Sequence, residues 1–139
     1  MMNNKIRILE VIDSGMIGGG QEHLFNLVMG LNPDQFDVSV SCPEDGPLSS
    51  RLKTEGFTIS PTNFRNRFDI MNAVSLYKIL KSNKIDIIHN HGSVAGAWGR
   101  IAAIFARTPV RIYTLHGIHY LNYSNLFLKH IFILMAAGK

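Results

Sequence analysis

Short apolar segments rich in β-branched residues alternate with segments of helical periodicity along almost the whole chain. Strands are predicted for residues 5–12, 36–42, 57–60, 85–89 and 110–115, and helices for residues 21–31, 48–55, 69–82, 94–107 and 123–137. Such alternation forms right-handed βαβ units, in which helices cover both faces of a parallel sheet. The sequence therefore predicts one α/β domain over residues 1–139, a Rossmann-like doubly wound parallel sheet with strand order 3-2-1-4-5.

The two helices predicted at 69–82 and 94–107 are expected to pack through their larger apolar side chains. We expect Asp69 and Ser93 to cap them, because short polar side chains satisfy free backbone N–H groups at a helix start. The predicted inner faces follow helical spacing. They consist of Ala73, Leu76, Tyr77 and Leu80 in the first helix, and of Ala97, Trp98, Ile101 and Phe105 in the second.

The composition is that of an ordinary globular protein, with 46% hydrophobic and 17% charged residues. Cys42 is the only cysteine, which excludes an internal disulfide and fits a reducing cytosol. No apolar run reaches the roughly 18 to 20 residues that span a bilayer. The net charge of +4 permits contact with an anionic membrane, but no segment has a nucleic-acid-binding pattern. We predict a cytoplasmic protein with access to the inner face of the membrane and no nucleic-acid partner.

A glycine-rich turn between the first strand and the first helix is the first candidate binding element. In parallel α/β sheets ligands bind at the carboxyl ends of the strands, where this turn lies. Glycines allow a ligand to approach the backbone, and the helix start offers N–H groups to an anion. The alternative is a simple tight turn. The spacing fits neither a Walker loop nor a dinucleotide fingerprint. We predict substrate binding by Gly18, Gly19, Gly20, Gln21 and Glu22.

A His-Asn-His-Gly segment closes the fourth predicted strand. Because alternate residues of a strand share a face, His89 and His91 can point the same way. We predict that they and Gly92 line a polar substrate cleft. One alternative is a packed histidine in the core, and another is a metal site. A metal needs a further ligand, for which the candidates are Asp13, Glu44 and Asp45. With so few carboxylates, no metal is predicted.

The turn after the fifth predicted strand carries the candidate catalytic residue. Gly117 allows an abrupt turn that exposes the imidazole of His116 in the crevice. A histidine there can donate to, or polarise, a substrate hydroxyl near neutral pH. We predict that His116 is catalytic and that Gly117 contributes to substrate binding. A hydrogen-bonded structural histidine is the alternative.

Basic residues gather around the third predicted helix. Such a run is usually a solvated face, but it also suits an anionic lipid surface. The residues concerned are Arg65, Arg67, Lys78, Lys81 and Lys84.

Three segments together resemble glycosyltransferase family 4. GMIGGGQEHLFNLVMGL is similar to the glycine loop and first helix of that family, DIIHNHGSVAGAWGRIAA to its fourth strand and following helix, and RIYTLHG to its fifth strand end. The resemblance covers residues 5–135. Gln21 is a departure, because the family usually has a small residue before the glutamate.

The resemblance implies one half of a two-domain GT-B fold. It implies a retaining, metal-independent hexosyltransferase without a cofactor, in which this domain binds a glycan or lipid-linked acceptor and a second domain binds the nucleotide-sugar donor. The role implied is in cell-envelope polysaccharide or glycolipid synthesis. Gly18, Gly19 and Gly20 would lie near the donor phosphates, and His116 near the transferring sugar.

The second domain of such an enzyme has no counterpart in these 139 residues. The groups that would neutralise the departing diphosphate are expected there, and such stabilisation is a large part of catalysis. We therefore expect a truncated transferase with negligible activity of its own. The alternatives are a stand-alone binding module of a split enzyme and a metallohydrolase that uses His89, His91 and His116.

Overall fold

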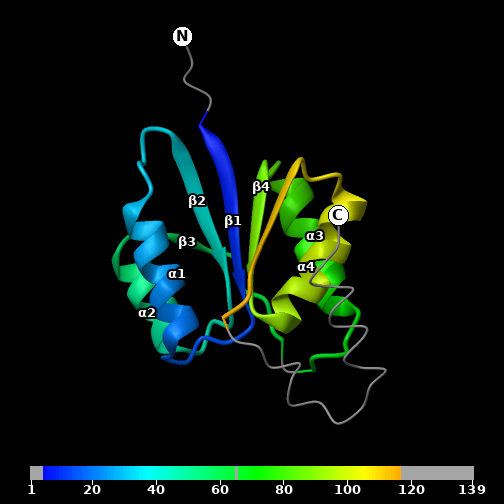
Figure 1. Cartoon of the computed structure of the whole chain (residues 1–139), viewed down its shortest axis with the longest axis horizontal. Coiled ribbons are helices and arrows are strands. Elements are labelled where there is room, and N and C mark those ends of the chain that lie inside the picture. Colours follow the sequence, from blue (N-terminus) through cyan, green and yellow to red (C-terminus); the bar gives the residue numbers. More distant parts are fainter. Residues whose placement is uncertain (1–4, 65, 117–139) are drawn as a thin grey trace.

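The computed structural model describes residues 5–64 and 66–116, which form a three-layer α/β/α arrangement (Figure 1). Its centre is a parallel five-stranded sheet in the order β3-β2-β1-β4-β5, so the predicted fold class and strand order are confirmed. The strands are β1 (Ile6–Ile12), β2 (Phe36–Ser41), β3 (Thr58–Ile59), β4 (Ile87–His91) and β5 (Val110–Thr114). The predicted helix at 123–137 and Gly117 lie outside the described residues.

Two helices cover each face of the sheet (Figure 1). They are α1 (Gly19–Gly30) and α2 (Pro47–Thr54) on one face, and α3 (Met71–Ser82) and α4 (Ser93–Ala106) on the other. The central strand β1 contributes to the core on both sides. Leu9 and Val11 pack in the cluster with α3 and α4, and Ile12 packs in the cluster with α1 and α2. No helix within residues 5–64 and 66–116 is long and apolar enough to cross a bilayer.

The fourth strand lies two residues later than predicted. Ile85 belongs to the turn that ends α3, since its backbone N–H donates to the carbonyl of Leu80 at 3.1 Å. Pairing with β1 begins at Ile87 and continues to His91. The two histidines of β4 are therefore strand residues held by ladder hydrogen bonds, which fixes their side chains on one face.

Helix α4 packs mainly through its smallest residues. Of the predicted inner face, Trp98 packs against the core cluster as expected, but Ile101 and Phe105 are exposed. Phe105 is 73% exposed and Ile101 38% exposed. The buried residues are Ala95, Gly96, Gly99, Ala102, Ala103 and Ala106. A Cβ on Gly96 would lie 2.4 Å from the ring of Tyr113, so the absent side chain lets the helix approach the sheet closely. In α3 the prediction holds for three of four residues, but Tyr77 is 38% exposed.

The predicted cap of α4 is also wrong, whereas Asp69 acts near the start of α3. Gly92 is the N-cap residue of α4, Ser93 is already helical, and no side chain caps the helix. Gly92 has φ 82°, a conformation that glycine adopts far more readily than other residues, and this sets the turn from β4 into α4. The Asp69 carboxylate accepts a hydrogen bond from the backbone N–H of Met71 at 2.9 Å.

Candidate functional site

The glycine loop and His116 lie together at the carboxyl end of the sheet, as predicted. A Cβ placed on Gly20 would lie 3.1 Å from Cδ2 of the His116 ring. A side chain at Gly20 would therefore require the His116 ring to shift by a few tenths of an ångström. Gly19 has open space within 4 Å of its missing Cβ, and Gly18 is the extended N-cap residue of α1. The loop is therefore held against a histidine from the other end of the described chain.

The two polar residues after the glycines contact other parts of the protein. The Gln21 side chain donates from Nε2 to the Ser14 carbonyl at 3.0 Å and so braces the loop. Glu22 forms an ion pair with Arg51 of α2, whose guanidinium lies 4.0 Å from the ring centre of Phe25. The substrate contacts expected for Gln21 and Glu22 remain predictions, but both residues have a structural partner.

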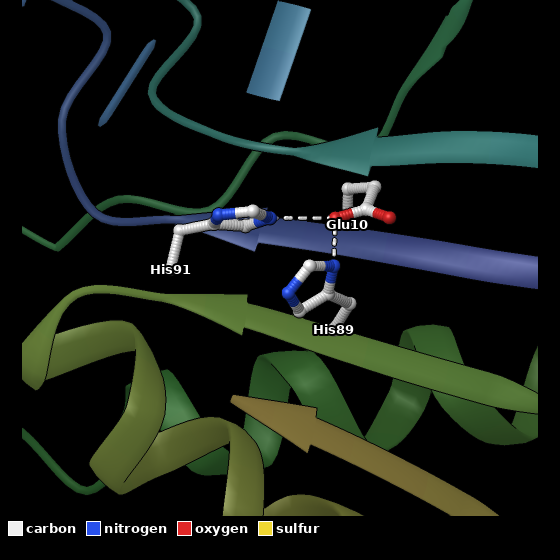
Figure 2. Close-up of side chains that lie close together, drawn as sticks. All are labelled: Glu10, His89 and His91. Carbon is white, nitrogen blue, oxygen red and sulfur yellow. Dashed lines mark hydrogen bonds and ion pairs between the residues drawn. The ribbon is translucent and has the colours of Figure 1, made fainter. Parts of the chain in front are cut away.

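A buried glutamate joins the two histidines of β4 (Figure 2). Glu10 pairs in register with His89, and both it and His91 project on the α1 side of the sheet. Oε2 of Glu10 lies 2.6 Å from Nε2 of His91 and 3.0 Å from Nδ1 of His89. His91 is fully buried and Glu10 is 2% exposed. The other ring nitrogen of His89 lies 2.8 Å from the hydroxyl of Thr114.

The network continues from His91 to the surface. Nδ1 of His91 lies 2.9 Å from Nε2 of His116, and the two rings stack with centroids 5.1 Å apart. His23 of α1 adds a further imidazole, edge-on to His116 at 5.1 Å. Three of the predicted site residues, His89, His91 and His116, are thus brought together. His91 contacts His116 directly, and Glu10 links His91 to His89.

Glu10 was not predicted from the sequence, because only carboxylates that follow strands were candidates. A charged residue inside the apolar run of residues 5–12 was the available signal. Buried acids are rare unless paired, so such a residue indicates a partner elsewhere in the fold. The partner could be found only from the register between β1 and β4.

The protonation of the network follows from burial and contacts. Burial by itself raises the pKa of Glu10, but hydrogen bonds and electrostatic attraction from His89 and His91 outweigh this and leave the pKa below its ordinary value. Burial lowers the pKa of His91 despite the contact with Glu10. Partial burial, with the neighbouring imidazoles, also lowers the pKa of His116. At neutral pH we expect the Glu10 carboxylate to face a neutral His91 ring.

Glu10, His89 and His91 are also the described residues that could hold a metal ion, since their ligand atoms lie within 4.8 Å of one another. However, one carboxylate oxygen contacts both rings at hydrogen-bond distances of 2.6 and 3.0 Å. A metal between these atoms would need about 2.0 to 2.2 Å to each ligand, so the 2.6 Å separation would have to widen. The geometry fits N–H donors on a shared carboxylate better than metal ligands.

Gly92 and Asp13 form one rim of the site. A Cβ on Gly92 would lie 3.6 Å from Oδ1 of Asp13, so the turn before α4 passes close to the end of β1. Burial raises the pKa of the Asp13 carboxyl above its ordinary value. Gly92 therefore contributes backbone shape to the predicted cleft.

The basic run lies on the surface around α3. Arg67, Lys78, Lys81 and Lys84 are exposed, and Arg65 lies outside the described residues. Between α3 and α4 lies an apolar groove of about 350 Å³, whose lining includes Ile70, Val74, Tyr77, Ile101 and Phe105.

Several solved structures share this fold. The chain is similar to Anabaena HepE in complex with UDP and glucose, with a TM-score of 0.72, 20% identity, and coverage of 94% of this chain and 35% of that one. It is also similar to a Listeria monocytogenes structure described as a UDP-N-acetylglucosamine 2-epimerase, with a TM-score of 0.68, 13% identity, and coverage of 96% and 38%. The chain thus has the Rossmann-like fold found in one part of GT-B glycosyltransferases.

The sequence comparisons are more specific than the fold. The glycosyltransferase family 4 pattern matches residues 17–137, and the chain belongs to that family. It is 38% identical over 120 residues to the Escherichia coli UDP-Gal:alpha-D-GlcNAc-diphosphoundecaprenol alpha-1,3-galactosyltransferase. This alignment covers 83% of the chain but only 31% of the relative. The chain therefore spans about a third of the length of the curated relative that it matches.

Proposed function

We propose that this chain is the acceptor-side domain of a retaining, metal-independent glycosyltransferase that moves a sugar from a nucleotide-sugar donor to a lipid-linked acceptor. The observation that carries the proposal is the 38% identity to the E. coli galactosyltransferase over 120 residues. The family match at residues 17–137, which includes the glycine loop, agrees with it. That enzyme's name specifies UDP-Gal and an α-D-GlcNAc diphosphoundecaprenol. By analogy, the acceptor here is a sugar diphosphate lipid of cell-envelope polysaccharide or glycolipid synthesis.

The geometry of the site supports this assignment. Gly20 and His116 are close enough for one ligand to contact the loop backbone and the imidazole together. Free N–H groups at the start of α1 suit a diphosphate, and a neutral His116 suits a sugar hydroxyl. We propose that His116 is catalytic and that the glycine loop, His91 and Gly92 contact the substrate. Most contacts with the donor would then lie in a second domain.

Acceptor binding by the 139-residue chain tests this proposal. We expect it to bind an α-D-GlcNAc diphosphate carrying a short prenyl tail, and to bind UDP-galactose much more weakly. Gly20→Val should weaken acceptor binding at least about tenfold, since the first added carbon alone would lie 3.1 Å from the His116 ring. Calorimetric titration, or chemical shift changes of labelled backbone amides, gives both affinities.

The matched control is Gly30→Val at the opposite end of the same helix. Nothing lies within 4 Å of a Cβ at Gly30, so this variant adds the same side chain without a collision at its first carbon. It should bind the acceptor like the unchanged chain. Tighter binding of UDP-galactose than of the acceptor would contradict the proposed domain role.

We also propose peripheral contact of the α3 region with the anionic inner face of the membrane, where a prenyl-linked acceptor would be found. The support is that exposed cations, Lys78 and Lys81, lie on α3, which is also one of the two helices that line the apolar groove. Cations attract anionic headgroups and apolar side chains enter the interface, and the two effects together favour stable binding.

Vesicle sedimentation tests this membrane contact. Neutralising Lys78 and Lys81 to Gln should weaken binding to phosphatidylglycerol-rich vesicles at least about tenfold, because each cation near the surface contributes about 1 kcal/mol. Lys5→Gln with Lys53→Gln changes the net charge equally but removes cations away from α3. Equal weakening by both pairs would mean that only net charge matters, and the proposed surface would be wrong.

A further inference from the structure

Glu10, His91 and His116 form a chain of hydrogen bonds from the core to the surface of the site. The two links are 2.6 Å from Glu10 Oε2 to His91 Nε2 and 2.9 Å from His91 Nδ1 to His116 Nε2. A neutral imidazole has one N–H donor and one acceptor nitrogen. The direction of the first hydrogen bond therefore determines the direction of the second.

The first hydrogen bond points from His91 to Glu10. Oε2 of Glu10 lies within hydrogen-bond distance of ring nitrogens of both His89 and His91. A proton on that oxygen could serve only one of them, whereas an ionised carboxylate oxygen accepts from both. Such charge-assisted bonds are short, and the 2.6 Å separation agrees with one. His91 therefore carries its proton on Nε2.

The second hydrogen bond then points from His116 to His91. With its proton on Nε2, a neutral His91 can only accept at Nδ1, so His116 must donate from Nε2. His91 is fully buried, which disfavours a charged ring at this position. The lowered pKa of His91 agrees with a neutral ring. His116 is left with an unprotonated Nδ1.

We propose that Glu10 and His91 are positioning residues that hold His116 as the Nε2–H tautomer, so that its Nδ1 accepts a hydrogen bond from a substrate hydroxyl. This inference rests on the proposed function and narrows it. Nδ1 of such a ring is an acceptor, so it pairs with the O–H of a sugar and repels a diphosphate oxygen. The diphosphate would then be bound by N–H groups of the loop.

A metal at Glu10, His89 and His91 would reverse this order. A nitrogen that binds a metal carries no proton. If Nε2 of His91 bound the metal, the ring proton of His91 would be on Nδ1. His116 would then accept at Nε2 and carry its own proton on Nδ1. The two arrangements predict opposite tautomers for the same histidine, which makes the tautomer a direct test.

The experiment is long-range ¹H–¹⁵N correlation NMR on the 139-residue chain with ¹⁵N-labelled histidine. It is recorded at pH 7.5 in the presence of a metal chelator. We expect His91 and His116 to be Nε2–H tautomers. In Glu10→Gln the amide can donate to His91, so His116 should lose its single tautomer and shift toward Nδ1–H. Thr114→Val is the matched control, because it removes the partner of His89 and leaves the other two links unchanged.

The outcomes separate the proposals. An Nδ1–H tautomer of His116 in the unchanged chain would overturn the inference, and so would an unaltered tautomer in a folded Glu10→Gln variant. Zinc titration that moves His89 and His91 signals at stoichiometric concentration would establish a metal site instead. If Glu10→Gln does not fold, the unchanged chain still decides the point. Acceptor binding is measured separately, so a failure of the proposed function leaves the tautomer result intact.

Discussion

Replacing His116 with alanine is expected to lower the turnover of a transferase that contains this domain by about 10² to 10³. The affinity for the nucleotide sugar should change much less. The reason is that positive charge builds at the anomeric carbon during transfer, so an acceptor nitrogen beside the sugar hydroxyls interacts more strongly in the transition state. A contact that strengthens there affects turnover more than substrate binding.

The large expected effect follows from the position of His116. Its ring is fixed on one side by the hydrogen bond to His91 and on another by close approach to Gly20. A group that is already oriented needs little reorganisation during the reaction, which is where enzymes gain most of their electrostatic stabilisation. A mobile surface histidine could not supply this.

A chimera provides the measurement. Residues 1–139 replace the matching third of the E. coli relative, to which they are 38% identical, and galactose transfer to the lipid-linked acceptor is followed. His23→Ala is the matched control, because this ring also lies beside His116, at 5.1 Å, without a place in the chain to Glu10. We expect a change of at most a few-fold from it. Near-normal turnover of His116→Ala in a folded chimera would make His116 a structural histidine.

The fold was predictable because it depends on patterns that a sequence displays directly. Strand and helix periods differ, and alternation of the two leaves few topologies. The place of the site followed in the same way, since glycine loop and strand ends must meet at one edge of a parallel sheet. Gly20 and His116, 96 positions apart in number, were assigned to one edge on this basis and do meet there.

Two of the errors concern contacts between elements. Hydropathy assigned Ile101 and Phe105 to the inner face of α4, but that face is occupied by glycine and alanine. Size rather than hydropathy decides the contact, and the required size depends on the residues of the facing strands. Glu10 is a similar case, because its histidine partners depend on the register between β1 and β4.

Substituting Gly99 with alanine is expected to destabilise the domain by about 3 kcal/mol or more, the upper part of the range for overpacked cores. The added Cβ would lie 1.8 Å from Oδ1 and 2.6 Å from Cγ of Asn90. Asn90 is fully buried in β4, so its side chain has nowhere to move. Alanine improves helix propensity over glycine by only about 1 kcal/mol, which cannot offset such a collision.

Neither Asn90 nor helix α4 can move away from the new Cβ without breaking other contacts. The Asn90 amide donates to the carbonyl of Ile112 at 3.4 Å, and its backbone belongs to a strand paired on both sides. Moving α4 outward would open the contacts of Ala95, Ala102 and Ala103 with the core. The matched control is Gly30→Ala, where nothing lies within 4 Å of the new Cβ, and urea unfolding should detect no loss.

Removing the obstructing side chain should rescue the variant. Oδ1 of Asn90 is buried and has no hydrogen-bond partner among the described residues, so Asn90→Ala sacrifices one weak hydrogen bond and some packing. In Asn90→Ala with Gly99→Ala the new methyl group occupies part of the vacated space. The double variant should therefore unfold at higher urea than Gly99→Ala alone, with a coupling free energy of at least about 1 kcal/mol. Strictly additive losses would mean that the cost at Gly99 arises from the helix itself rather than from its contact with Asn90.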